Sequence, residues 1–140
     1  DVSDAIRTPE VSSGASTVSA HPDVRTALLS LQREVANQSN VVVEGRDTGT
    51  VVFPKAEVKF FLTASLEQRA KRRFEELTAK GVVVNYDDTL IAMRERDERD
   101  EKRAAAPLRR ADDAIELDTT PMTIEQVLGF MIEHVRKRIL

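Results

Sequence analysis

The chain has 140 residues, a length that suits a single domain, and its net charge of −3 argues against a dedicated nucleic-acid binder, which carries a basic surplus. It contains no cysteine, which excludes disulfides and thiol chemistry, and no apolar run approaches the length of a membrane span. We therefore expect a cytoplasmic protein with no membrane partner and no nucleic-acid partner.

The first part of the chain predicts two helices. Thr8 and Pro9 form a typical helix start, but small polar residues that favour a helix only weakly follow them. Such a segment suits either a mobile surface or a close approach to another surface. A stronger helix begins at Pro22. Its apolar residues recur at helical spacing, at Val24, Leu28, Leu31 and Val35.

Val41–Val43 is a β-branched run without polar alternation, which predicts a strand buried on both faces. It leads directly into segment 44–50, EGRDTGT, at what would be the carboxyl end of the strand. Ligands of open α/β sheets bind beyond the carboxyl ends of the strands. We therefore favour a binding site at Arg46 and Asp47 over an ordinary polar loop with a local ion pair.

Strands and helices alternate in the rest of the chain. A strand is expected within 58–62, then a helix from the capping box at 65–68, then a helix from 87–88 to Pro107. A short strand follows at 114–117, and a second capping box at 123–126 opens the last helix. This order predicts an α/β fold with a largely parallel sheet.

The composition of two helix faces predicts their surroundings. The apolar stripe of the last helix predicts core packing; it comprises Val127, Leu128, Met131, Ile132, Val135 and Ile139. The basic residues of the helix after residue 65 predict a solvated face; they are Arg69, Lys71, Arg72 and Arg73.

Segment 94–103, RERDERDEKR, has the densest charge in the chain. On a helix, Arg96, Arg99 and Arg103 would share a face, and Asp100 would lie one turn beyond Arg96. One interpretation is a solvated helix stabilised by its own ion pairs, at about 0.2–0.5 kcal/mol each. The other is a mobile set of guanidinium groups that binds phosphate. The segment alone favours the first, because most charge runs are solvated.

Few catalytic chemistries fit these residues. The chain has no HExxH motif, no Cys/His cluster and only two histidines, so no metal site is predicted. His134 lies beside the apolar stripe of the last helix and is interpreted as structural. Arginine with carboxylate occurs at Arg46–Asp47 and again in 94–103, which suits phosphoryl transfer, a reaction that depends on positioning and positive charge.

Three stretches carry a family resemblance: GRDTGTVVFP at 45–54, RERDERDEKRAAAPL at 94–108 and EVSSGASTVSAHPDVR at 10–25. Together they resemble bacterial cytidylate kinases, which are nucleoside-monophosphate kinases, over essentially the whole chain. The resemblance implies a three-layer, parallel-sheet P-loop kinase fold. It also implies transfer of the terminal phosphate of ATP to CMP or dCMP, with Mg²⁺, in pyrimidine metabolism. Segment 94–110 then becomes a lid that contributes to the site.

The resemblance implies roles for individual residues at the strand end. Ser16, Arg25 and Asp47 match residues that hold the cytosine. This agrees with the chemistry of the base, whose amino group suits a carboxylate and whose acceptors suit arginine or hydroxyl groups. Arg46 matches a residue that binds the CMP phosphate, and Glu44 matches an acidic residue at the end of the strand.

The lid contributes four further residues by the same resemblance. Arg96 and Asp100 match a pair near the ribose. Arg103 matches another arginine of the CMP site and is assigned a catalytic role. Arg99 lies in the matching lid and is expected to reach the transferred phosphate.

The chain departs from the family in lacking a GxxxxGK[ST] phosphate loop, so its ATP-binding residues are unknown. We expect the fold without its first strand and phosphate loop, and a chain that is inactive by itself. Residues 1–40 would be the remainder of the monophosphate-binding region and the helix that follows it. Residues 41–140 would be the core α/β domain. We expect a monomer.

There are two alternative functions. The first is a non-catalytic module that binds nucleotide or phosphate. The second is an arginine-rich RNA-binding segment, which the acidic balance and the lack of aromatic stacking residues near 94–103 disfavour.

Overall fold

Two parallel strands form the sheet, β1 (Phe60–Thr63) and β2 (Ile115–Asp118). Their register pairs Phe60 with Ile115 and Thr63 with Asp118. Parallel neighbours need a long crossover, which two helices supply here, and the expected α/β fold with a parallel sheet is confirmed. The computed structural model describes residues 2–3, 5–36 and 38–139.

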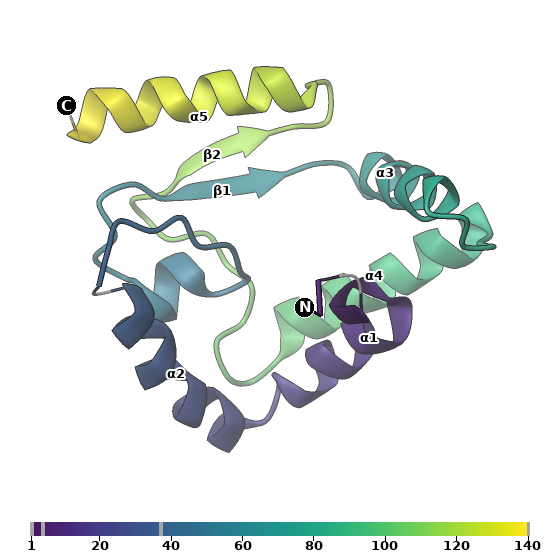
Figure 1. The fold of residues 1–140 in the computed structure, drawn as a ribbon, viewed down its shortest axis with the longest axis horizontal. Helices are drawn as coiled ribbons and strands as arrows, with labels where there is room; N and C mark the ends of the chain where they lie inside the picture. The colour runs from purple at the N-terminus through teal and green to yellow at the C-terminus, as the bar shows by residue number, and fades with distance from the viewer. Residues whose placement is uncertain (1, 4, 37, 140) are drawn as a thin grey trace.

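Helices account for most of the described chain, and Figure 1 shows their arrangement. The α-helices are α1 (Pro9–Val18), α2 (Pro22–Ala36), α3 (Leu66–Ala79), α4 (Tyr86–Lys102) and α5 (Ile124–Ile139). Two short turns complete the set, η1 (Ala5–Arg7) and η2 (Thr48–Val52). No helix of the described ranges is long and apolar enough to cross a membrane.

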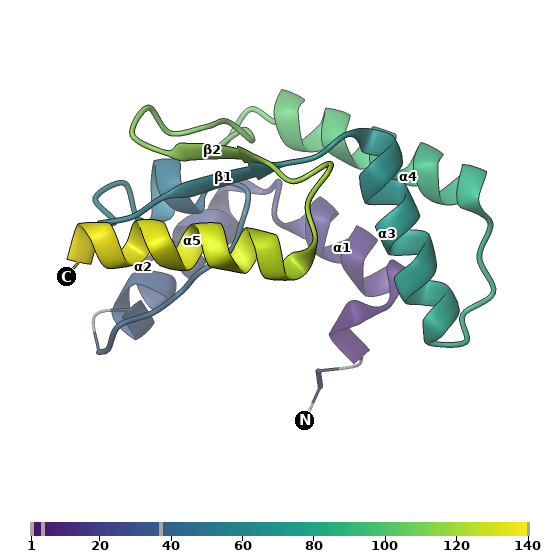
Figure 2. The same cartoon turned by 90° about the horizontal axis from the view of Figure 1, so that it is seen from above.

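The helices flank the sheet in distinct places. α5 lies along one side of the two strands, and α1 and α2 lie on the other side (Figure 1). β1 points towards α3 and α4, which Figure 2 shows from above. The carboxyl ends of both strands therefore point towards α3 and the start of α4. Helix α4 is the charged helix, and it runs from there towards α1.

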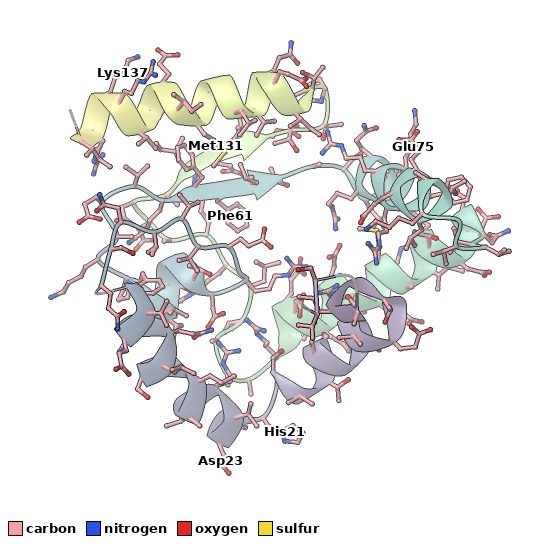
Figure 3. The ribbon with its side chains drawn as sticks, viewed as in Figure 1. His21, Asp23, Phe61, Glu75, Met131 and Lys137 are labelled. Carbon is pink, nitrogen blue, oxygen red and sulfur yellow. The ribbon has the colours of Figure 1, made fainter. Side chains whose placement is uncertain are left out.

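The hydrophobic core is small. Its buried apolar side chains among the described residues are Val52, Ala70, Leu77 and Leu117. Figure 3 places Met131 on the side of α5 that faces the strands, and Met131, Val127 and Val135 are half-buried. The other three members of the predicted stripe are exposed, so the prediction of core packing is wrong for Leu128, Ile132 and Ile139. The physical reason is that two short strands cover only part of the helix face.

The predicted buried strand at Val41–Val43 is not formed. Val42 is 100% exposed, while Val41 and Val43 line an apolar hollow of about 310 Å³ together with α2 and Phe53. A strand needs a hydrogen-bonding neighbour, and within the described ranges β1 pairs with β2 alone. The run therefore has the composition of a strand but no neighbouring strand to pair with in the described ranges.

The two predicted capping boxes form to different extents. Thr123 and Gln126 make both reciprocal bonds, at 2.8 and 3.3 Å. Ser65 accepts a hydrogen bond from the Gln68 amide, but its own amide donates to Thr120 Oγ1 at 2.9 Å instead of to the Gln68 side chain. This bond ties the start of α3 to the loop after β2.

Helix α4 starts one residue earlier than predicted. Asn85 is the N-cap, and its side-chain oxygen accepts hydrogen bonds from the amides of Asp87 and Asp88. The two aspartates therefore occupy the first turn, where their charges favour the helix dipole.

Two arginines of α3 are structural rather than solvated. Arg69 forms an ion pair with Asp97 of α4 at 2.7 Å, and Arg72 donates to the Thr119 carbonyl at 2.6 Å. The prediction of a solvated face is therefore wrong for these two residues, while Lys71 is exposed as expected. The Arg69–Asp97 pair links α3 to α4 and so helps to set the position of the charged helix.

Candidate functional site

Asp47 is the first centre of the site. It is the N-cap of η2 and only 9% exposed. Its side-chain Oδ2 accepts a hydrogen bond from Nη2 of Arg25 on α2, and its Oδ1 lies 3.6 Å from Nη2 of Arg103 at the end of α4. The turn thus brings one carboxylate to guanidinium groups from two helices that are far apart in the chain.

Asp100 is the second centre, and it is 5% exposed. Its Oδ2 accepts a hydrogen bond of 2.8 Å from Nε of Arg46 and lies 3.8 Å from Nε of Arg96. The Asp100 carbonyl accepts from the amide of Leu108, which folds the segment after α4 back onto the helix. The turn carrying Arg46 and the helix carrying Asp100 are therefore joined directly.

Helix α1 closes the site on a third side. Ser12 Oγ accepts a hydrogen bond of 2.8 Å from Nη1 of Arg96. Ser16 lies one turn further on the same face and is half-buried, and its hydroxyl makes no hydrogen bond within the described ranges. The small residues of α1 therefore do permit a close approach, which was one of the two interpretations of this segment.

Two buried guanidinium nitrogens form no hydrogen bond within the described residues, although each lies within ion-pair distance of a carboxylate, at 3.6 and 3.8 Å. Arg96 Nε and Arg103 Nη2 make no hydrogen bond although both atoms are buried. Burial lowers the pKa of both arginines, and neighbouring positive charge lowers each pKa further, from Arg46 for Arg96 and from Arg25 for Arg103. Buried donors are nearly always satisfied, so these two nitrogens are available to an acceptor that enters the site.

The cluster carries an excess of positive charge. Arg25, Arg46, Arg96 and Arg103 surround the two carboxylates of Asp47 and Asp100. Four guanidinium groups against two carboxylates leave two positive charges uncompensated. A phosphate monoester carries about −1.5 to −2 charges at pH 7, so its charge complements this cluster.

The turn after α4 fixes Arg103. Nε of Arg103 donates to the carbonyl of Ala106 at 2.5 Å. Ala106 has a φ of 51°, in the left-handed region. Such a conformation costs an L-residue about 1–2 kcal/mol, and surrounding contacts must hold it in place. The bond from Arg103 is one such contact, so the side chain and the turn stabilise one another.

Arg99 does not join the cluster. It is exposed on the outer side of α4, in an open hollow of about 360 Å³ with Glu95, Glu98 and Lys102. Lys102 and Glu98 form an exposed ion pair at 3.1 Å, as expected for a solvated face. Glu44 is also exposed and outside the cluster.

The structure thus brings together six of the predicted site residues, with Ser16 at the edge and Arg99 apart. The six are Arg25, Arg46, Asp47, Arg96, Asp100 and Arg103. Sequence reasoning missed Ser12, for which the only signal was its i, i+4 spacing from Ser16. Within the part of the chain that the structure describes, no three His, Cys, Asp or Glu side chains are grouped so that they could hold a metal ion.

Comparison with known proteins shows the family of the chain. The sequence model of the family described as "Cytidylate kinase" matches residues 1–137. Curated cytidylate kinases of Geobacter sulfurreducens and Syntrophotalea carbinolica are each 55% identical over 138 residues, which is 99% of this chain and 59% of each relative. The cytidylate kinase of Mannheimia succiniciproducens is 48% identical over 139 residues, 62% of its length. The chain spans about three fifths of the length of these relatives, and it belongs to the cytidylate kinase family.

Proposed function

We propose that the protein is a nucleoside-monophosphate kinase that transfers the terminal phosphate of ATP to CMP or dCMP, giving CDP or dCDP. The activity is proposed for the whole protein, because the phosphate loop that binds ATP in this family is not in residues 1–140.

One observation carries this proposal: the arginine cluster has two buried nitrogen donors without a hydrogen bond and an excess of positive charge. Phosphate oxygens are the acceptors that guanidinium groups bind best, because two parallel N–H groups meet two oxygens. Burial strengthens these bonds, since the local dielectric is low. A nucleoside monophosphate would satisfy Arg96 Nε and Arg103 Nη2 and neutralise the cluster.

The base is assigned to the Asp47 end of the cluster. A carboxylate has about four lone-pair sites, so Asp47 can accept from the cytosine amino group while it contacts Arg25 and Arg103. Arg25 can donate to the ring acceptors of cytosine, and the unbonded Ser16 hydroxyl can complete the recognition. Uracil offers a carbonyl in place of the amino group and would face the Asp47 carboxylate unfavourably.

The phosphate and the ribose are assigned to the Asp100 end. Arg46 would bind the phosphate of CMP, and Arg96 with Asp100 would hold the ribose. Arg103 would contact the monophosphate and stabilise charge during transfer, where positive groups act mainly by positioning and electrostatics. Arg99 is assigned to the transferred phosphate, which requires the exposed side chain to turn inward when the lid closes.

The same proposal covers the division of the chain. Residues 1–40 would contribute to the monophosphate side, and 41–140 would form the core with a lid at about 94–110. ATP would be the phosphate donor, and Mg²⁺ would be the cofactor. No residue of this chain is assigned to the metal, since Asp47 and Asp100 already pair with arginines. We expect the whole protein to be a monomer.

A coupled ADP-release assay on the whole protein tests the proposal, with CMP, dCMP, UMP and AMP compared. We expect CMP and dCMP to be phosphorylated much faster than UMP and AMP. Equal use of all four would contradict the assignment of cytosine to Asp47 and Arg25. Calorimetric binding of CMP without any release of ADP would instead favour a non-catalytic nucleotide-binding module.

A further inference from the structure

Arg33 of α2 holds the far end of the turn that carries Asp47. Its Nε donates to the Val52 carbonyl at 2.9 Å, and its Nη2 donates to the Val51 carbonyl at 2.8 Å. Two consecutive carbonyls thus receive two N–H groups of one guanidinium. The planar geometry of arginine suits this arrangement, whereas a lysine ammonium is a single point of attachment.

Hydrogen bonds within the turn connect the residues held by Arg33 to Asp47. The Asp47 carbonyl accepts hydrogen bonds from the amides of Thr50, Val51 and Val52, at 3.2, 2.8 and 3.2 Å. The peptide units that bond to Asp47 therefore belong to the same short turn whose final carbonyls Arg33 holds. A shift at Val51 and Val52 would move the backbone of Asp47 with it.

Helix α2 grips this turn at two points. Arg25 holds the Asp47 side chain at the start of η2, and Arg33 holds the carbonyls at its end. Apolar packing contributes little, because no α2 residue is buried within the described ranges and Leu28, Leu31 and Val35 are exposed. The relative placement of α2 and the turn thus depends strongly on these two arginines.

We propose that Arg33 is a positioning residue for the monophosphate site: it sets the placement of Asp47 relative to Arg25 and Arg103. The inference rests on the proposed function. Arg33 has no contact with the arginine–aspartate cluster, so its effect on substrate passes through η2. Loss of Arg33 then loosens the geometry at Asp47 while every group that contacts substrate is retained.

The test compares Arg33→Gln and Arg33→Lys with wild type in the whole protein, by steady-state kinetics with CMP and with ATP. Arg136→Gln is the matched control, an exposed arginine near the end of α5 that forms no ion pair with the residues that the structure describes. We expect Arg33→Gln to raise KM for CMP about tenfold, since small displacements at a site have large kinetic effects. Arg33→Lys should give a smaller rise, and KM for ATP should change less than about twofold in both.

A purely structural role would lower Tm and the active fraction without a selective change in KM. A second measurement separates the two roles: Arg33→Gln in an Asp47→Asn background should cause no further rise in KM for CMP, because its effect acts through Asp47. Where Arg33→Gln does not fold, Arg33→Lys carries the same comparison.

The outcomes distinguish this inference from the proposed function. A wild-type protein that phosphorylates CMP, with an unchanged KM in the folded Arg33 variants, overturns the positioning role alone. Additive effects of Arg33→Gln and Asp47→Asn also overturn it. A wild-type protein that does not phosphorylate CMP overturns the proposed function, and the positioning role falls with it.

Discussion

Arg46 and Asp100 are 54 positions apart in the chain, yet Arg46 Nε and Asp100 Oδ2 meet at 2.8 Å. The carboxylate is nearly inaccessible to solvent, and Arg96 approaches the same oxygen from one turn earlier on α4. A buried carboxylate that pairs with two arginines is favourable only while the negative charge and the positive charges are all present. This pair therefore joins the turn that carries Arg46 to the charged helix α4.

Asp100→Asn should destabilise the whole protein by about 2–3 kcal/mol, because Arg46 and Arg96 lose the charge that compensates them. Urea denaturation gives the free energy of unfolding. Asp112→Asn is the control, since Asp112 is exposed and pairs with no cation in the described part of the chain. Equal stability of the two variants would show that the Arg46–Asp100 pair does not hold the turn to α4.

Asp47→Ala should weaken CMP binding by at least about tenfold and leave ATP binding nearly unchanged, because Arg25 and Arg103 lose their shared acceptor. Calorimetry with each nucleotide in turn measures both affinities, with Asp112→Ala as the control variant. Unchanged CMP affinity, or a parallel loss for both nucleotides, would remove Asp47 from the cytosine site.

Arg103→Ala should reduce kcat by about a hundredfold, because a buried donor near the monophosphate is lost. The fold should stay intact, with a loss of about 1 kcal/mol for the bond to Ala106. Steady-state kinetics and thermal denaturation measure the two effects separately.

Arg99→Ala is the informative companion to Arg103→Ala. If Arg99 reaches the transferred phosphate on closure, kcat should fall while Tm stays unchanged, since the side chain is exposed in this structure. Wild-type kcat in Arg99→Ala would leave Arg99 as part of the solvated face.

A large loss of Tm in Arg103→Ala would favour a structural role for Arg103 over its proposed contact with substrate.

Asp113 makes stability depend on pH through Lys59. The hydrogen bond from the Lys59 ammonium lowers the pKa of Asp113 below its ordinary value near 3.8. A carboxyl group with a lowered pKa stabilises the fold above its unfolded pKa, and this stability is lost as the pH falls through the folded pKa. The difference in unfolding free energy between wild type and Asp113→Asn should therefore be present at pH 5–7 and shrink below about pH 3.8.

Denaturant titrations at several pH values test this prediction. Lys59→Met is the companion variant, because the Lys59 side chain is only 6% exposed and Asp113 is solvated. We expect Lys59→Met to cost less stability than Asp113→Asn, which leaves a buried ammonium with only the Pro54 carbonyl as its acceptor. A difference between wild type and Asp113→Asn that does not change with pH would argue against the ion pair.

Helix starts were predictable from local sequence where their partners lie within one turn. Thr123 and Gln126 form the full capping box because both bonds span three residues. Ser65 shows the limit of such reasoning. The Ser65 amide donates to Thr120, which lies 55 residues away, and a local sequence pattern cannot predict that partner.

The orientation of α4 was not predictable in the same way. Helical spacing places Arg96, Arg99 and Arg103 near one another. The structure instead directs Arg96, Asp100 and Arg103, at i, i+4 and i+7, into the cluster, with only Asp100 buried, and leaves Arg99 exposed. The two arrangements differ by a rotation of the helix about its axis. Contacts from other elements select between them, through Ser12 on α1 and Arg69 on α3.

The sequence by itself therefore determined the α/β class, the main helices and the strands near 60 and 115. These depend on periodicity, capping and motif, which are local properties of the chain. The tertiary structure alone decided which arginine meets which carboxylate, and that the run Val41–Val43 remains exposed without a paired strand. Such pairings depend on segments that are distant in sequence, and each is favourable only when its partner is brought within hydrogen-bonding distance.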